Sequence, residues 1–337
     1  MYEFTVHRFL PINWFFPESE FVSGFILFQG GKITYAFLKI LSWLICLLPF
    51  SLAVTLGRAL AHFAWLFVSG RRKKLARENI QKCLGVDAQT AAEIAKASAI
   101  NFGNIFIEVL RFPELKRTMK SHVKIVGLEH LQNYIASSNG RGGVIMTSHS
   151  DNWELMGGAF AQYGIPLVGV AKKQKSDGAD KFINEFRTNI GMHITYHSGV
   201  REMYQLLDGG RFIGLIMDQD VGRHDGVIVK FFNRATNYVT GAASMSRFKG
   251  VPIFPAFMHR NPDGTHTLEV QPPLYVERTK DKRTDIWEMT QKLAALTEEH
   301  IRRYPREWFW LHDRWKSIRN EFSPEEIAEL NRQLGLN

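Results

Sequence analysis

A histidine and a glutamate, five residues apart, stand at the end of the apolar run 143–147. The run is a predicted buried strand, and polar residues separate it from a predicted helix that begins at Trp153. Ligand sites in open α/β sheets lie at such carboxyl ends of strands. Because five residues turn an ideal helix through about 500°, His149 and Glu154 can meet only if His149 precedes the helix. In that arrangement the carboxylate could orient the imidazole for proton transfer.

The same residues also have a purely structural interpretation. Asp151 and Glu154 have the three-residue spacing of a helix N-terminal cap. Glu154 could then serve the cap, and His149 could be an ordinary turn residue. The spacing alone leaves both interpretations open.

Charged residues at two further places could take part in a site. Asp218 and Asp220 follow the predicted strand 212–217, where they could bind a metal, orient a base, contact sugar hydroxyls or simply cap a turn. Arg187 lies in a polar helix and could clamp a phosphate with two hydrogen bonds, or be a solvated surface charge.

Several common chemistries have no support in the chain. There is no G-x-S-x-G elbow, no P-loop and no dinucleotide fingerprint. The two cysteines, Cys46 and Cys83, make neither a disulfide framework nor a metal site, so no metal is predicted. The net charge of +9 favours an anionic partner, but no nucleic-acid-binding module is recognisable.

Apolar runs and helical stretches alternate along most of the chain. Strands are predicted at 143–147, 166–171, 193–196, 212–217, 227–232, 252–258 and 266–270. Helices are predicted at 87–111, 153–163, 178–189, 200–208, 240–249 and 285–304, with another starting at Pro305. This alternation predicts an α/β fold with a mostly parallel central sheet flanked by helices.

An apolar segment precedes this region. Residues 37–56 are about long enough to span a bilayer, which takes roughly 20 residues, although Pro49 would kink or split a helix there. The basic run 71–74 follows, and such charge marks the cytoplasmic side and attracts anionic headgroups. We therefore expect a membrane-associating helical segment at 1–70 and an α/β domain at 71–337. The alternative is a buried helical hairpin in a soluble protein.

The motif from His149 to Glu154 resembles the H-x4-D/E motif of glycerolipid acyltransferases, in the H-x-G-N-W-E form of the lipid A biosynthesis acyltransferase family. The likeness continues in order through RRKKLARENIQKC at 71–83, D-Q-D at 218–220, the segment 231–257 and PREWFWLHDRWK at 305–316. The chain departs from the pattern at Asp151, where the family usually has glycine, and at Met217, where it often has proline. These departures leave the substrate open.

The resemblance implies a membrane-bound O-acyltransferase at the cytoplasmic face of the bacterial inner membrane. It would move a fatty acyl chain from an acyl carrier protein thioester to a hydroxyl of an anionic, lipid A-type glycolipid, without metal or organic cofactor. His149 would be the general base and Glu154 would orient its ring. The residues expected to bind the acceptor or support the site are Arg187, Asp218, Asp220 and Asn152, the last through nearby backbone groups.

Three alternatives remain open at this point. The acceptor could be another glycolipid or phospholipid, such as a phosphatidylinositol mannoside. Water could replace the acceptor, which would make the protein a thioesterase. The chain could also be a membrane-anchored scaffold with a degenerate site.

Overall fold

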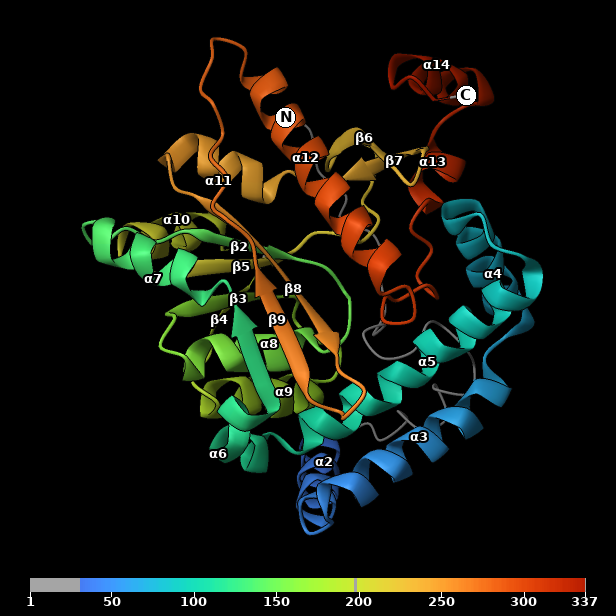
Figure 1. Cartoon of the computed structure of the whole chain (residues 1–337), viewed down its shortest axis with the longest axis vertical. Helices are drawn as coiled ribbons and strands as arrows, with labels where there is room; N and C mark the ends of the chain where they lie inside the picture. Colours follow the sequence, from blue (N-terminus) through green and yellow to red (C-terminus); the bar gives the residue numbers. More distant parts are fainter. Residues whose placement is uncertain (1–30, 197–198, 337) are drawn as a thin grey trace, which may run out of the picture.

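A computed structural model describes residues 31–196 and 199–336 of the chain (Figure 1). Residues 1–30 of the predicted segment 1–70 therefore lie outside the described residues. The described helices are α2 Gly31–Cys46, α3 Phe50–Phe67, α4 Gly70–Leu84, α5 Ala88–Leu110, α6 Phe112–His122, α7 Leu128–Ser137, α8 Trp153–Gln162, α9 Asp177–Asn189, α10 Val200–Asp208, α11 Gly241–Lys249, α12 Lys282–Arg303, α13 Lys316–Glu321 and α14 Pro324–Gln333. The strands are β1 Val123–Val126, β2 Val144–Thr147, β3 Leu167–Ala171, β4 His193–Tyr196, β5 Phe212–Ile216, β6 Val227–Phe231, β7 Arg234–Tyr238, β8 Ile253–Arg260 and β9 His266–Val270.

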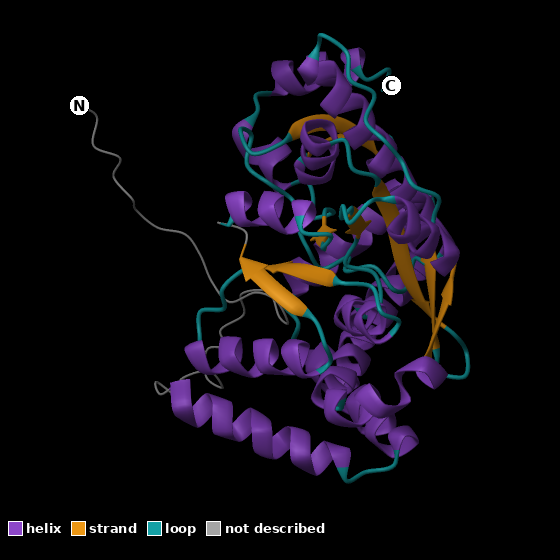
Figure 2. Cartoon of the chain, turned by 90° about the vertical axis from the view of Figure 1, so that its left-hand side faces the viewer, coloured by secondary structure: helices purple, strands orange, loops and turns teal. Residues whose placement is uncertain are grey.

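The central sheet has the strand order β1-β9-β8-β2-β5-β3-β4, and every neighbouring pair except β8–β9 is parallel. The sheet is twisted, and in Figure 2 strands in different parts of it run in clearly different directions. The predicted α/β class with a mostly parallel sheet is confirmed.

One predicted strand does not join this sheet. The run 227–232 forms β6, which pairs antiparallel with β7 in a separate hairpin. Phe232 and Asn233 connect the two strands with φ angles of 51° and 54°. Two left-handed residues make the tight turn that suits an antiparallel hairpin, so β6 finds its partner only two residues further along the chain.

Helices cover both faces of the sheet, and alternate strand residues enter two separate cores. On β2, Val144 and Met146 pack with residues of α10, α11 and α12. Ile145 faces the other way and packs with residues of α5, α6, α8 and α9. A strand with both faces buried needs the continuous apolar run that 143–147 supplies.

β2 and β5 are neighbours in this sheet, with Thr147 opposite Ile216. Because the two strands are parallel, the segments that follow them leave the sheet at the same side, where the strands end. His149 and Asp218 each follow the last residue of their strand by two positions. The topology therefore brings these two side chains together, although 69 residues separate them in sequence.

Pro49 separates two helices rather than kinking one, because α2 ends at Cys46 and α3 begins at Phe50. The outward faces of the pair are apolar, with Ile33, Phe37, Ile40, Trp43, Leu44, Leu52, Leu56, Leu60, Phe63, Leu66 and Phe67 exposed. Within the described residues, α3 is the one helix with the length and apolar character of a membrane span, and 11% of that window is buried. The predicted N-terminal apolar helical segment is confirmed for residues 31–67.

α3 lies against α5 along much of its length (Figure 1). Gly57 and Gly103 stand at the closest approach, where an added Cβ on Gly103 would lie 2.5 Å from the Cβ of Ala61 and 2.8 Å from the carbonyl oxygen of Gly57. α2 packs instead on α9, where Lys39 forms a 2.8 Å ion pair with Glu185. Both apolar helices are thus part of the packed structure.

The segment predicted to start a helix at Pro305 is irregular until α13 begins at Lys316. Trp308 forms a β-bridge with Ser150, and the indole N–H of Trp310 donates to the carbonyl of Pro305 at 2.7 Å. These bonds replace the helical ones. The helix predicted at 285–304 begins earlier, at Lys282, because the Asp281 carboxylate caps the N–H groups of Arg283 and Thr284.

Candidate active site

His149 is held by Asp218 at the shared edge of β2 and β5. Its Nδ1 lies 2.7 Å from one carboxylate oxygen of Asp218, and its backbone N–H donates to the other oxygen at 2.9 Å. Both residues are buried. The imidazole ring is therefore fixed both through its own backbone and through its side chain.

The carboxylate of Asp218 receives a third donor, the indole N–H of Trp308, at 2.6 Å. Burial alone would raise the pKa of Asp218, but the charge and hydrogen bonds of His149 and the Trp308 bond outweigh it and lower the pKa to about 2. An ionised carboxylate can only accept hydrogen bonds and cannot donate one. Nδ1 of His149 must therefore carry a proton, which leaves Nε2 without one in the neutral ring.

Nε2 of His149 faces the side-chain amide of Gln219, whose nitrogen lies 3.3 Å away. The ring also meets Trp153 edge to face, with 4.9 Å between ring centroids. An imidazole with a bound carboxylate on one nitrogen and a lone pair on the other is the arrangement of a general base.

The carboxylate of Glu154 is bound by a different partner, Arg187. Its two carboxylate oxygens accept from the guanidinium of Arg187, one of them at 2.8 Å, and both side chains are buried. The sequence predicts that Glu154 orients His149, whereas the carboxylate beside Nδ1 of His149 belongs to Asp218. Arg187 likewise is a buried partner of Glu154 and not a solvated surface charge.

Asn152 caps α8, since its side-chain oxygen accepts the backbone N–H of Leu155 at 2.9 Å. Its amide nitrogen donates to Glu108 of α5 at 2.8 Å. The spacing of Asp151 and Glu154 suggests a helix cap, but Asn152 is the residue that caps the helix. Asn152 ties the start of α8 to α5.

Asp151 has a left-handed backbone, with φ of 47°. This conformation explains why glycine suits the position, because a side chain there costs of the order of 1 kcal/mol. The carboxylate of Asp151 is held in return by Arg260 at 3.2 Å and by Nδ1 of His266 at 2.6 Å. Arg260 also pairs with Glu108 through two hydrogen bonds.

These side chains form a largely buried cluster of two carboxylates and two cationic groups, in which only Arg260 is partly exposed: Glu108, Asp151, Arg260 and His266. Burial alone would lower the pKa of His266, but the charges of Asp151 and Glu108 raise it to about 9. The cluster is therefore neutral as a whole near pH 7. It anchors the loop that carries His149 to α5 and to the β8–β9 hairpin.

Asp220 points to the C-terminal segment. Its carboxylate accepts the backbone N–H of Ser317 at 2.9 Å and the hydroxyl of Ser317 at 2.7 Å, and Arg314 lies 3.6 Å away. Its own backbone N–H donates to Nε2 of His312 at 3.0 Å. Burial and the nearby charge of Arg314 lower the pKa of His312 to about 3, so its ring stays neutral and can accept this bond.

The structure thus brings together His149 and Asp218, pairs Glu154 with Arg187, and directs Asp220 and Asn152 to supporting contacts. Sequence reasoning did not single out Trp308, His312 or the cluster around Glu108. The signal for Trp308 and His312 was the aromatic-rich segment 305–316. No group of three or more histidine, cysteine or acidic side chains within the described residues could hold a metal ion.

Proteins named as acyltransferases are similar to this chain. The family model for bacterial lipid A biosynthesis acyltransferases matches residues 30–317. A phosphatidylinositol mannoside acyltransferase from Mycolicibacterium smegmatis is 26% identical over 261 residues, which cover 75% of this chain and 82% of the relative. A lipid A biosynthesis palmitoleoyltransferase from Escherichia coli is 24% identical over 312 residues, which cover 90% of this chain and 96% of the relative.

Among solved structures, the 1-acyl-sn-glycerophosphate acyltransferase from Thermotoga maritima aligns with a TM-score of 0.35 and 12% identity, covering 83% of this chain and 99% of that one. The family match spans most of the described residues, including the loop that bears His149 and the turn that bears Asp218. The chain therefore belongs to the bacterial lipid A biosynthesis acyltransferase family and is an acyltransferase for a glycolipid.

Proposed function

We propose that this protein transfers a fatty acyl chain from an acyl carrier protein thioester to a hydroxyl of a lipid A-type glycolipid, with His149 as general base. The observation that carries the proposal is the buried His149–Asp218 pair, which leaves a lone pair on Nε2. An acceptor hydroxyl in the place of the Gln219 amide would meet that lone pair directly.

In the first step Nε2 takes the hydroxyl proton while the hydroxyl oxygen bonds to the thioester carbonyl carbon. The carbon–sulfur bond of the resulting tetrahedral intermediate then breaks. The imidazolium returns its proton to the departing thiolate, which leaves as a thiol. Asp218 stays ionised throughout and stabilises the imidazolium. General-base catalysis of this kind typically contributes ~10²–10⁴-fold in rate.

We assign the developing oxyanion to the N-terminal end of α8, next to His149. Unpaired N–H groups and the helix dipole make such an end favourable for negative charge. Asn152 would position this end through its cap and its bond to Glu108. The Glu154–Arg187 pair would hold the first turn of α8 against α9, which makes both residues supports of the site.

We place the reaction at the cytoplasmic face of the inner membrane. The exposed apolar faces of α2 and α3 would lie in the lipid, and Arg71 to Lys74 at the start of α4 would meet anionic headgroups. The net charge of +9 would speed the encounter with acyl carrier protein, a small acidic protein.

The test is acyl transfer by the purified, membrane-reconstituted protein, with acyl carrier protein thioester as donor and a lipid A precursor as acceptor. His149→Ala should lower kcat at least about 10²-fold. The matched control is His193→Ala, which removes an exposed histidine from the edge strand β4 and should change nothing. Turnover by His149→Ala at the wild-type rate would refute the assignment.

A phosphatidylinositol mannoside is the second candidate acceptor, favoured by the similarity to the mycobacterial enzyme. Offering both acceptors to the same preparation decides between them by mass spectrometry of the lipid products. Release of free fatty acid without any acylated lipid would instead identify a thioesterase. A scaffold with a degenerate site would consume no thioester.

A further inference from the structure

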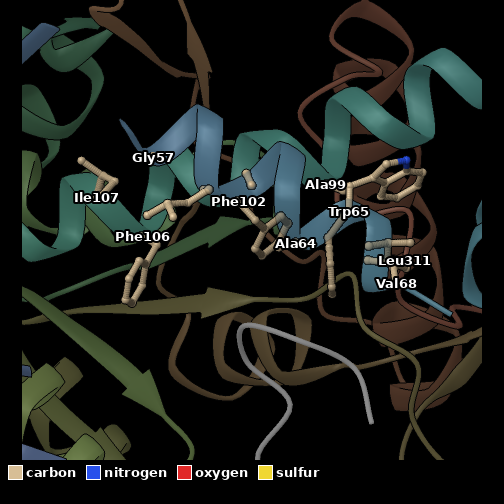
Figure 3. Close-up of a pocket in the computed structure, with 13 residues that line it drawn as sticks. Gly57, Ala64, Trp65, Val68, Ala99, Phe102, Phe106, Ile107 and Leu311 are labelled. Atoms are coloured by element: carbon tan, nitrogen blue, oxygen red, sulfur yellow. The ribbon is translucent and has the colours of Figure 1, made fainter. Parts of the chain in front are cut away.

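An apolar pocket of about 210 Å³ lies between α3 and α5 (Figure 3). α3 contributes small residues such as Gly57, Ala61 and Ala64, and α5 contributes Ala99 and Phe102. None of the side chains that line it is charged. An apolar cavity of roughly 150 Å³ already takes up a small hydrocarbon, so this one is large enough for part of a lipid chain.

The packing of the two helices accounts for the pocket. Gly57 and Gly103 let the backbones of α3 and α5 approach closely, and an added Cβ on Gly57 would collide with Ile107. Further toward the C-terminal end of α3, Ala64 and, on α5, Ala99 line the pocket, and their small side chains leave space between the helices unfilled. The residue types that line this space therefore keep it open.

The pocket reaches toward the proposed general base through aromatic rings. Phe102 and Phe309 line it, with their ring centroids 4.2 Å apart. Phe102 also packs against Trp153 at 5.8 Å, and Trp153 meets the His149 ring at 4.9 Å. A chain in the pocket would thus end close to the reacting centre without entering it.

Cationic groups border the pocket where α3 ends. Trp65 and Leu311 line this end. The guanidinium of Arg72 donates to the carbonyl of Leu311 at 3.2 Å, and the ammonium of Lys73 lies 4.9 Å from the centroid of the Trp65 ring. A hydrocarbon slot with positive charge at one end is complementary to an anionic lipid, which would enter sideways from the bilayer.

We propose that this pocket holds one hydrocarbon chain of the acceptor lipid, with the anionic headgroup of that lipid beside Arg72 and Lys73. The headgroup would then lie at the segment that includes His312, which bonds the turn after Asp218. The acceptor hydroxyl would thereby be presented to His149. This inference rests on the proposed function and names how its acceptor is held.

The kinetic test compares a substitution that fills the pocket with a matched substitution on the exposed face of α3. Ala64→Phe adds a ring inside it, and Ala59→Phe adds the same ring to the exposed face of α3. With a tetraacylated lipid A precursor and a phosphatidylinositol mannoside as acceptors and the protein in nanodiscs, Ala64→Phe should raise the acceptor KM at least about tenfold. The donor KM and the effect of Ala59→Phe should stay near wild type. Equal effects of both variants, or a raised donor KM, would overturn the proposal.

A second test needs no turnover, so failure of the proposed function would be distinguishable from failure of this site. Vesicles contain phosphatidylglycerol or phosphatidylcholine, each with a photoreactive diazirine in one acyl chain. The anionic probe should label peptides of α3 and α5 in the wild type and in Ala59→Phe, and much less in Ala64→Phe. Arg72→Gln with Lys73→Gln should reduce its labelling to that of the zwitterionic probe. Equal labelling of the wild type by both probes, or undiminished labelling of Ala64→Phe, would refute the site.

Discussion

Replacing Asp218 by asparagine should disable the base without changing the shape of the site. In the wild type, one carboxylate oxygen receives two N–H groups, from Trp308 at 2.6 Å and from the His149 backbone at 2.9 Å, while the other faces Nδ1 of His149. An amide must turn its oxygen toward those two donors. Its NH₂ group then faces Nδ1 and donates to it.

The consequence is a change of tautomer. Nδ1 of His149 becomes the acceptor, so the ring proton moves to Nε2, which no longer has a lone pair for the substrate hydroxyl. The same substitution in a serine–histidine–aspartate triad lowers kcat about 10⁴-fold for this reason. We expect a loss of about that size in acyl transfer by Asp218→Asn.

Two measurements check the reasoning. The first is kcat for transfer by the reconstituted variant, compared with that of the wild type and of His149→Ala. The second is the nitrogen NMR spectrum of ¹⁵N-histidine-labelled protein, which should show the proton on Nδ1 in the wild type and on Nε2 in the variant. An active variant, or one whose His149 keeps the wild-type tautomer, would refute the assignment of Asp218.

Three further predictions concern stability. The raised pKa of His266 stabilises the fold below pH 6.5, and this contribution, on the order of 3 kcal/mol, is lost as the pH rises through about 9. Chemical unfolding at pH values between these limits should show the decrease in the free energy of unfolding. His266→Gln should remove this pH dependence. Glu154→Gln should cost about 3–5 kcal/mol because it leaves the buried Arg187 charge without its partner. Glu154→Met combined with Arg187→Met should recover much of that stability; no recovery in unfolding experiments would contradict a purely paired role. Gly103→Leu should separate α3 from α5, because even its Cβ would lie 2.8 Å from the carbonyl of Gly57; a melting temperature equal to that of the wild type would contradict this.

Local patterns were sufficient to predict most of the elements that position the site. The apolar run before His149 and the one before Asp218 are buried strands that end at the same edge of the sheet. From the residues alone, Glu154 is the predicted partner of His149, because it is close in sequence and could reach the imidazole from the first turn of the helix. The contact that forms is between neighbouring strands, and strand order is not visible in a single sequence.

The buried cluster could not have been predicted, for the same reason. Glu108, Asp151 and His266 come from a helix, a turn and the β8–β9 hairpin, which are far apart along the chain. Each of them, taken alone, resembles an ordinary surface residue. Helical periodicity predicts a helix from Pro305, but this segment is irregular because Trp308 bonds to Asp218 and to Ser150.

The ion pair between Lys39 and Glu185 connects α2, the helix proposed to lie in the lipid, to the helix that carries Arg187. Anything that pulls α2 out of register, such as a harsh detergent, would be transmitted through α9 to the start of α8. On the proposed membrane placement, extraction from the bilayer would then depress turnover even though every catalytic atom is still present. Rates measured in micelles are therefore a lower bound, and nanodiscs are the appropriate setting for comparing variants.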